Sequence, residues 1–355
     1  MALYLFFLLT TFLAAADTGR APAAPDPRVP RLAAEVRNKG WIVFSAKTPN
    51  GDWDLFLMRP DGSKLRNISN TPGANEMGAR FSPDGRKMLY RLIAKGSTIP
   101  HDRWGALGKL VIANADGANP VTWGQDGEYP WASWSPDGKQ LACLNKTGIE
   151  IVAVDTKAVV RKMDRKGIYQ QFFWSPDGKW FTGPANSYGE NWTVVRMDAN
   201  SQEVNVVSKF QNCTPDWFPD SKRLIFSSRP ASQPDDELAK AVGQKPGYGW
   251  TQLWMANGDG SGKSLVYGED GRHIYGGALS PDGNYVLFTR GLRDGLSGDQ
   301  NGGVIGLMRM RDAPTIGGAS AALRKLHPHT KDGPVLTLPM GWEPHWTYAA
   351  IPSSK

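Results

Sequence analysis

The stretch Phe81-Ser82-Pro83-Asp84-Gly85 decides the fold, because the chain repeats it. It returns as Trp134-Ser135-Pro136-Asp137-Gly138, as Trp174-Ser175-Pro176-Asp177-Gly178, in altered form as Trp217-Phe218-Pro219-Asp220-Ser221, and as Leu279-Ser280-Pro281-Asp282-Gly283. A last copy, Trp346-Thr347, keeps only the aromatic residue. We call the first residue of each copy its anchor and the strand that ends there the anchor strand. The copies follow one another at intervals of 40 to 67 residues. A period near 40 residues with variable insertions is typical of a β-propeller.

The repeated phrase has the chemistry of a tight turn between two strands. Proline presets φ, aspartate accepts a hydrogen bond from a nearby backbone N–H, and glycine supplies the positive φ that closes a hairpin. An apolar run follows every copy, as in Met88–Tyr90, Leu141–Cys143 and Tyr285–Phe288, and indicates the second strand of a hairpin. Two further strands follow in each unit, the last of them as in Val204–Val207 and Val335–Leu338. Four short strands make one propeller blade.

The two ends of the chain supply the last blade. The anchor strand Trp342–Tyr348 has no hairpin partner after it, and Trp41–Ser45 resembles the strands that follow an anchor but has no anchor before it. Pairing these two strands removes exposed sheet edges. The sequence therefore predicts an all-β fold, a six-bladed β-propeller closed by its N- and C-terminal strands; the alternative is an open array of hairpins.

These repeats resemble the WD40-like (PD-type) propeller repeats of the TolB-like family, over roughly residues 40 to 350 and in five recognisable copies of the motif. The resemblance implies a stand-alone propeller of an exported bacterial protein. One departure matters, because TolB carries an α/β domain ahead of its propeller and only a short linker precedes Trp41 here. The role of TolB is therefore not carried over to this chain.

The sequence divides into four parts. Residues 1–16 are apolar and end in Ala14-Ala15-Ala16, which is typical of a secretory signal peptide. Residues 17–38 are rich in Ala and Pro and are interpreted as a linker, residues 39–350 as the propeller, and residues 351–355 as a C-terminal tail. We expect a periplasmic or secreted protein without a stable membrane anchor. An uncleaved N-terminal anchor is the alternative, since no Lys or Arg precedes the apolar run.

The charge pattern argues against nucleic acid as a partner. The formal net charge is +7, but the basic residues are scattered singly after turns, with no run and no interleaved aromatic stripe. Two interpretations of the positive charge remain: a solvated surface without a specific partner, or a surface that attracts an anionic glycan or an acidic protein. We expect a monomer that binds a protein or glycan partner and no nucleic acid.

Loop length suggests which face carries function. The Ser-Pro-Asp-Gly turns on one face are short and regular, whereas the loops of the other face vary in length: Ala94–Ala106, Ala185–Asn191, Arg229–Trp250 and Arg290–Gly303. Long loops on a rigid scaffold often carry binding residues. The segments that lead into the anchor strands converge on the central opening from that face. We predict that they bind a ligand or partner there through Glu76, Glu128, Tyr169, Asp216, Arg272, His273, Glu343 and His345.

Nothing in the sequence is a catalytic signature. There is no Gly-x-Ser-x-Gly nucleophile motif, no phosphate-binding loop and no dinucleotide fingerprint. His273, Glu343 and His345 could approach one another, but their spacing matches no metal-ligand motif, so we predict neither metal nor cofactor. The first hypothesis is a non-enzymatic binding or protein-interaction scaffold. The second is a carbohydrate-active enzyme, a lyase or hydrolase, with paired carboxylates such as Glu76 and Glu343 in a central pocket.

Overall fold

The computed structural model describes ten stretches of the chain: residues 26–97, 108–189, 192–209, 212–229, 251–269, 272–291, 303–311, 314–317, 324–325 and 327–351. The predicted signal peptide and most of the long loops lie outside them. The described residues form helix α1 (Arg28–Val36) and 24 strands. No helix among them is long and apolar enough to cross a membrane.

Four sheets have the size of one propeller blade, and they follow one another along the chain. Sheet 1 consists of β4 (Ala74–Phe81), β5 (Lys87–Ala94), β6 (Lys109–Asn114) and β7 (Val121–Trp123). Sheet 2 consists of β8 (Trp131–Trp134), β9 (Gln140–Leu144), β10 (Ile149–Ala153) and β11 (Val159–Met163). Sheet 3 consists of β12 (Phe173–Trp174), β13 (Trp180–Ala185), β14 (Thr193–Asp198) and β15 (Val204–Ser208). Sheet 4 consists of β16 (Asn212–Trp217), β17 (Arg223–Ser228), β18 (Gln252–Asn257), β19 (Ser264–Glu269) and the added parallel strand β23 (Thr315–Gly317).

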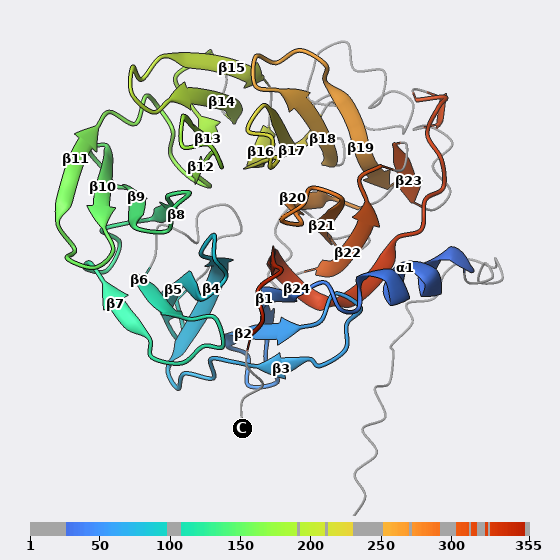
Figure 1. The fold of residues 1–355 in the computed structure, drawn as a ribbon, viewed down its shortest axis with the longest axis horizontal. Helices are drawn as coiled ribbons and strands as arrows, with labels where there is room; N and C mark the ends of the chain where they lie inside the picture. Colours follow the sequence, from blue (N-terminus) through green and yellow to red (C-terminus); the bar gives the residue numbers. More distant parts are fainter. Residues whose placement is uncertain are drawn as a thin grey trace, which may run out of the picture.

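The other strands form one larger sheet of seven. In hydrogen-bonded order it consists of β20 (Ile274–Leu279), β21 (Tyr285–Arg290), β22 (Gly303–Arg309), β24 (Leu336–Thr347), β1 (Trp41–Lys47), β2 (Trp53–Met58) and β3 (Arg66–Asn67). Figure 1 shows all the sheets set around a central axis, with β4, β8, β12, β16 and β20 innermost and β3, β7, β11, β15 and β23 outermost. The fold is a β-propeller, as predicted.

The seven-stranded sheet arises because β24 is one continuous strand of 12 residues. Its first half pairs with β22 (Leu336 opposite Leu307), and its second half pairs with β1 (Trp346 opposite Ile42). The sequence predicts a separate outer strand at residues 335–338 and a separate anchor strand from Trp342. Only three residues separate these two runs, too few to leave the sheet and return. The hydrogen bonds therefore group the strands into five sheets, of which four are single blades.

The repeated turn is held by its serine and aspartate. In sheet 2 the Ser135 hydroxyl donates to Asp137 Oδ1 (2.6 Å) and accepts a hydrogen bond from the Gln140 backbone N–H (2.9 Å). The Lys139 N–H also donates to Asp137 Oδ1 (3.0 Å). Ser82, Ser175 and Ser280 make the corresponding hydroxyl–aspartate bond in their own turns. The repeat is thus a hydrogen-bonding unit that fixes where each inner strand ends.

Helix α1 lies within residues 17–38, where the sequence predicts a linker. Its Leu32 and Val36 are fully buried and pack in one apolar cluster with Ile42, Leu307 and Trp346. The spacing of four residues places both side chains on one face of the helix. The predicted C-terminal tail also begins with a packed residue, since Ile351 is buried. Composition alone predicts a linker and a tail here, because it does not reveal which few apolar side chains pack against the propeller.

Because α1 is a packed element, the substitution Leu32→Ala is expected to lower the free energy of unfolding by about 2–4 kcal/mol, the usual range for a buried leucine. Asn38→Ala, at an exposed position after the helix, serves as the control and is expected to change stability little. Chemical denaturation of both variants measures the difference. Equal stability of Leu32→Ala and the parent protein would show that packing of α1 does not contribute to the stability of the fold.

Candidate ligand-binding cavity

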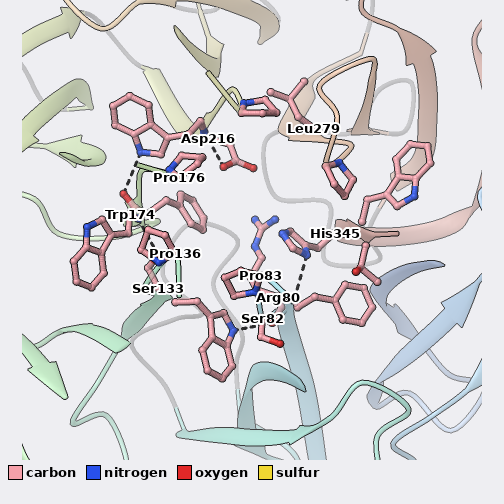
Figure 2. Close-up of a pocket in the computed structure, with 18 of the residues that line it drawn as sticks. Arg80, Ser82, Pro83, Ser133, Pro136, Trp174, Pro176, Asp216, Leu279 and His345 are labelled. Carbon is pink, nitrogen blue, oxygen red and sulfur yellow. Dashed lines mark hydrogen bonds between the residues drawn. The ribbon is translucent and has the colours of Figure 1, made fainter. Parts of the chain in front are cut away.

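The residue directly before the anchor lines a central space in five of the six repeats. These residues are Arg80, Ser133, Phe173, Asp216 and His345, whereas Ala278 packs in the apolar cluster that contains α1. Alternate side chains of a strand point to opposite sides, so packing the anchor against a neighbouring sheet turns the preceding side chain away from it. Figure 2 shows Arg80, Asp216 and His345 directed toward the same central space.

This central space is a cavity of about 360 Å³. Arg80, Asp216 and His345 line it together with aromatic residues and with a proline from each of five repeated turns: Phe173, Trp134, Trp174, Trp217 and Trp346, and Pro83, Pro136, Pro176, Pro219 and Pro281. The prolines place the cavity at the end of the axis that carries the short Ser-Pro turns (Figure 2). The sequence predicts binding at the opposite, long-loop end, so the location differs from the prediction.

A backbone irregularity recurs three residues before most anchors. Gly78, Gln171, Thr214, Gly276 and Glu343 all have positive φ, between 42° and 66°. In four of the inner strands the register shifts at this point. Positive φ is uncommon for residues other than glycine and costs energy, above all for a β-branched residue such as threonine. Neighbouring inner strands offset part of that cost with hydrogen bonds across their boundary.

These inter-sheet bonds link one inner strand to the next. The Thr214 N–H donates to Gln171 Oε1 (2.9 Å), and the Gly276 N–H donates to Thr214 Oγ1 (3.1 Å). The Gly78 N–H donates to Ser45 Oγ (3.1 Å). Each bond satisfies a buried N–H that the shifted register leaves without a strand partner. The bulges therefore place polar side chains around the axis in a fixed arrangement.

Arg80 supplies the positive charge at the floor of the cavity. Its Nη2 lies 3.5 Å from Glu343 Oε2, and its guanidinium lies 5.0 Å from the centre of the Phe173 ring. Its Nη1 is buried without a hydrogen-bond partner within the described part of the chain. The side chain is 16% exposed. Arg80 therefore has donor capacity that the protein does not use fully.

Asp216 and His345 are both shifted toward their neutral forms. Burial raises the pKa of Asp216 to about 6, although the Arg80 charge and a hydrogen bond from the Trp217 N–H (2.8 Å) oppose this. Burial and the nearby Arg80 charge hold the pKa of His345 well below its usual range. The Phe81 N–H donates to His345 Nδ1 (3.1 Å), so the proton of the neutral ring is on Nε2. Near neutral pH the floor thus carries one cation, one titrating acid and one neutral histidine.

Two layers lie beneath this floor. In the first, Gln171 Nε2 donates to Glu343 Oε1 across the axis (3.4 Å). In the second, inner-strand residues of several sheets belong to one apolar cluster: Met77, Trp131, Phe172, Tyr275 and Trp342. Tyr275 and Trp342 are in ring contact, with centroids 5.8 Å apart.

Of the eight predicted site residues, Asp216 and His345 line the cavity, and Glu343 lies one layer below. Glu343 is buried and pairs with Arg80, and His345 Nδ1 accepts a hydrogen bond from the Phe81 N–H. The structure does not bring the other five to the cavity. Both Glu343 and His345 contribute to packing, so alanine substitutions there test stability as well as binding.

The other five predicted residues have local partners. Glu128 is exposed and accepts a hydrogen bond from the Gln125 N–H (2.7 Å), and Tyr169 packs edge-on against Trp192. Arg272 pairs with Glu269 (2.9 Å), and His273 Nδ1 accepts from the Thr251 N–H (3.1 Å). Glu76 is fully buried.

Glu76 on β4 packs against the neighbouring strands β2 and β3. Ser69 Oγ, after β3, donates to Glu76 Oε2 (3.0 Å), while Oε1 is buried without a hydrogen-bond partner among the described residues. Burial raises the pKa of Glu76 to about 7, and the nearby Asp54 carboxylate contributes in the same direction. Glu76 is therefore an interior acid and does not reach the cavity.

Sequence reasoning missed Ser133, Phe173 and the anchor tryptophans as cavity residues. A usable signal was present, because both the anchor and the residue directly before it line the cavity in five of the six repeats. Loop length favoured the long-loop end of the axis, whereas the cavity lies at the end that carries the short turns.

The buried Glu76 predicts a pH-dependent stability. Its pKa is higher in the folded protein (about 7) than the ordinary 4.5, so its contribution is fully present below pH 4.5 and is lost as the pH rises toward 7. The loss amounts to about 3 kcal/mol, at about 1.4 kcal/mol for each pH unit between the two pKa values. Glu76→Gln, which stays neutral, is expected to remove this dependence, so that denaturation at pH 5 and pH 8 gives a smaller difference than in the parent. The exposed control Glu128→Gln should behave like the parent; a Glu76→Gln variant that does so as well refutes the assignment.

Comparison with known proteins supports the fold. No protein-family model matches the sequence, and no curated protein matches it. Among solved structures, TolB from Acinetobacter baumannii is similar with a TM-score of 0.60 and 17% identity, over 87% of this chain and 67% of that one. Oligogalacturonate lyase from Vibrio parahaemolyticus gives a TM-score of 0.42 at 13% identity, over 76% of this chain and 70% of that one. The similarity to TolB shows a shared fold alone, and this chain has a TolB-like β-propeller fold.

Proposed function

We propose that this chain is an exported, non-enzymatic β-propeller that binds a partner molecule in its central cavity. The observation that carries this proposal is the composition of the cavity, which combines apolar walls with an incompletely satisfied arginine at its floor. Concave sites of this size with a few convergent polar groups are the usual form of a ligand pocket. The long-loop face that the sequence favours becomes a second, outer contact surface for a protein or glycan.

The chemistry of the cavity favours a chain end or side group that bears a carboxylate. Trp134, Trp217 and the turn prolines offer flat apolar contact. Arg80 can donate to an anion, and a partly buried site strengthens such a charge-assisted bond. Asp216 opposes an anion while it is ionised, and this opposition disappears on protonation.

The architecture belongs to the same proposal. We infer that the seven-stranded sheet represents two blades that meet where β24 changes partner between Gly341 and Trp342. Residues 39–350 then form a six-bladed, monomeric propeller closed by the pairing of β1 with β24, and residues 351–355 end the chain. Helix α1 packs against this propeller and belongs to the same folded unit, so the proposed linker is limited to residues 17–27.

Export rests on the sequence of residues 1–16, with its apolar run and Ala-x-Ala end. Mass spectrometry of the mature protein is expected to find Asp17 at the N-terminus. A soluble cytoplasmic protein that retains Met1 would contradict export.

One observation favours the carbohydrate-active alternative. A carboxyl group with a pKa near neutrality beside an arginine, as in Asp216 and Arg80, is a candidate general acid or base. The pair Glu76 and Glu343 does not serve, since Glu76 contacts Ser69 and Glu343 contacts Arg80. A panel of uronic-acid and other glycan substrates tests this alternative; turnover that Asp216→Asn abolishes would establish it in place of the binding function.

Binding in the cavity can be followed by tryptophan fluorescence, because several tryptophans line its wall. Peptides selected from a random library displayed on phage serve as probes. Arg80→Gln is expected to weaken their binding about tenfold or more, the loss of one charge-assisted hydrogen bond. For carboxylate-bearing peptides, binding to the parent is expected to strengthen as the pH falls from 7.5 to 5, and Asp216→Asn is expected to remove most of this dependence.

The matched control is Arg86→Gln, an exposed arginine in the turn that follows the same anchor. It is expected to leave affinity unchanged, and thermal melting establishes that each variant is folded. Selected peptides that bind Arg80→Gln and the parent equally would locate the partner on an outer surface. Binding that weakens as the pH falls would instead indicate a cationic ligand held by Asp216.

A further inference from the structure

A second cavity lies on the outside of the propeller, where α1 covers the large sheet. Its volume is about 440 Å³. Figure 1 shows α1 beside β22 and β24, with β23 nearby. Five cationic side chains line this cavity: Arg28 and Arg31 from α1, Arg309 and Arg311 at the end of β22, and Lys331. They come from three separate segments of the chain.

Hydrogen bonds hold the walls of this cavity in place. Arg28 Nη2 donates to the Asp332 carbonyl oxygen (2.6 Å), which joins α1 to the segment 331–334. Arg309 pairs with Glu35, which joins β22 to α1. The Ile316 N–H donates to the Lys331 carbonyl oxygen (3.0 Å), which joins β23 to the same segment. The cationic cluster is therefore assembled by the fold.

The acidic groups around the cavity are already engaged. Asp26 pairs with Arg28 (2.6 Å), Glu35 with Arg309, and Asp332 with Arg324 (2.5 Å).

Three cations remain beyond these pairs. Arg31, Arg311 and Lys331 are exposed, and none of them has an ion pair with another residue that the structure describes. The cavity thus carries an excess of positive charge that the described acids do not neutralise.

We propose that Arg31, Arg311 and Lys331 form, with Arg28 and Arg309 behind them, a binding site for a phosphate group. Phosphate carries more than one negative charge and several acceptor oxygens, so it can engage cations that arrive from different directions. Arginine offers paired donors that match phosphate oxygens, and lysine adds a point charge. The phosphate can belong to a soluble compound or to the headgroup of an anionic lipid, and the same contacts serve both.

The test uses isothermal titration calorimetry at low ionic strength, with inorganic pyrophosphate as the probe. The full-length protein as produced is expected to bind it, and affinity is expected to fall as salt is added. The variant Arg31→Gln/Arg311→Gln/Lys331→Gln is expected to bind at least about tenfold more weakly, the loss of one or more charge-assisted contacts. All three positions are exposed, so its melting temperature is expected to stay within a few degrees of the parent.

The control variant Lys87→Gln/Lys139→Gln/Lys222→Gln removes the same charge from exposed positions after the repeated turns. It is expected to retain pyrophosphate binding. The proposal fails if the parent does not bind pyrophosphate, or if the control weakens binding as much as the first variant does, since attraction would then follow net charge alone.

Co-sedimentation with phosphatidylglycerol and phosphatidylcholine vesicles identifies the source of the phosphate. Binding to phosphatidylglycerol vesicles that the first variant loses and the control keeps supports the site and assigns it to a lipid headgroup. Pyrophosphate binding without vesicle binding supports the site and assigns it to a soluble phosphate compound.

Discussion

The rest of this structure depends on the packing of an anchor residue at the end of each inner strand. The anchor lies between neighbouring sheets, and the hydrogen-bonded Ser-Pro-Asp-Gly turn begins directly after it. Since side chains alternate along a strand, the residue before the anchor is directed to the other side. One repeated packing requirement thus fixes the turn, the sheet boundary and the lining of the central cavity.

Charge in the cavity follows from the same constraint. Three inner strands place Arg80, Asp216 and His345 in one poorly solvated space, although they are far apart in the sequence. There burial and the arginine charge disfavour a protonated histidine, and burial disfavours an ionised aspartate. The inter-sheet bonds from Thr214 and Gly276 keep the neighbouring backbone in register. The resulting floor has one strong cation and one acid that titrates near physiological pH.

Much of the fold could be predicted from the sequence, because the turn chemistry is local. Ser135 and Asp137 bond within five residues of each other, so the repeat that they mark can be read directly. The continuity of β24 and the packing of Leu32 could not be read in this way, since each depends on contacts with distant strands. The composition of residues 17–38 favoured a linker where α1 lies, because the few residues that pack are surrounded by Ala, Arg and Pro.

The candidate site was predicted less well than the fold. Asp216 and His345 were selected because they enter anchor strands, and both line the cavity. The same rule also selected Glu128 and Arg272, which have local partners. Side chains alternate between the two sides of a strand, so a shift of one residue decides whether such a residue faces the axis. The bulge before the anchor changes this alternation. Glu76 and Glu343 show the consequence, since both are buried away from the cavity.

The central claim is that Arg80, Asp216 and His345 share one buried space at the axis. The most direct measurement is an NMR titration of the Asp216 carboxyl carbon in the parent protein and in Arg80→Gln. We predict a pKa near 6 for Asp216 in the parent and a higher pKa in the variant, because the arginine charge that favours the carboxylate is gone. An ordinary aspartate pKa that Arg80→Gln leaves unchanged would contradict it.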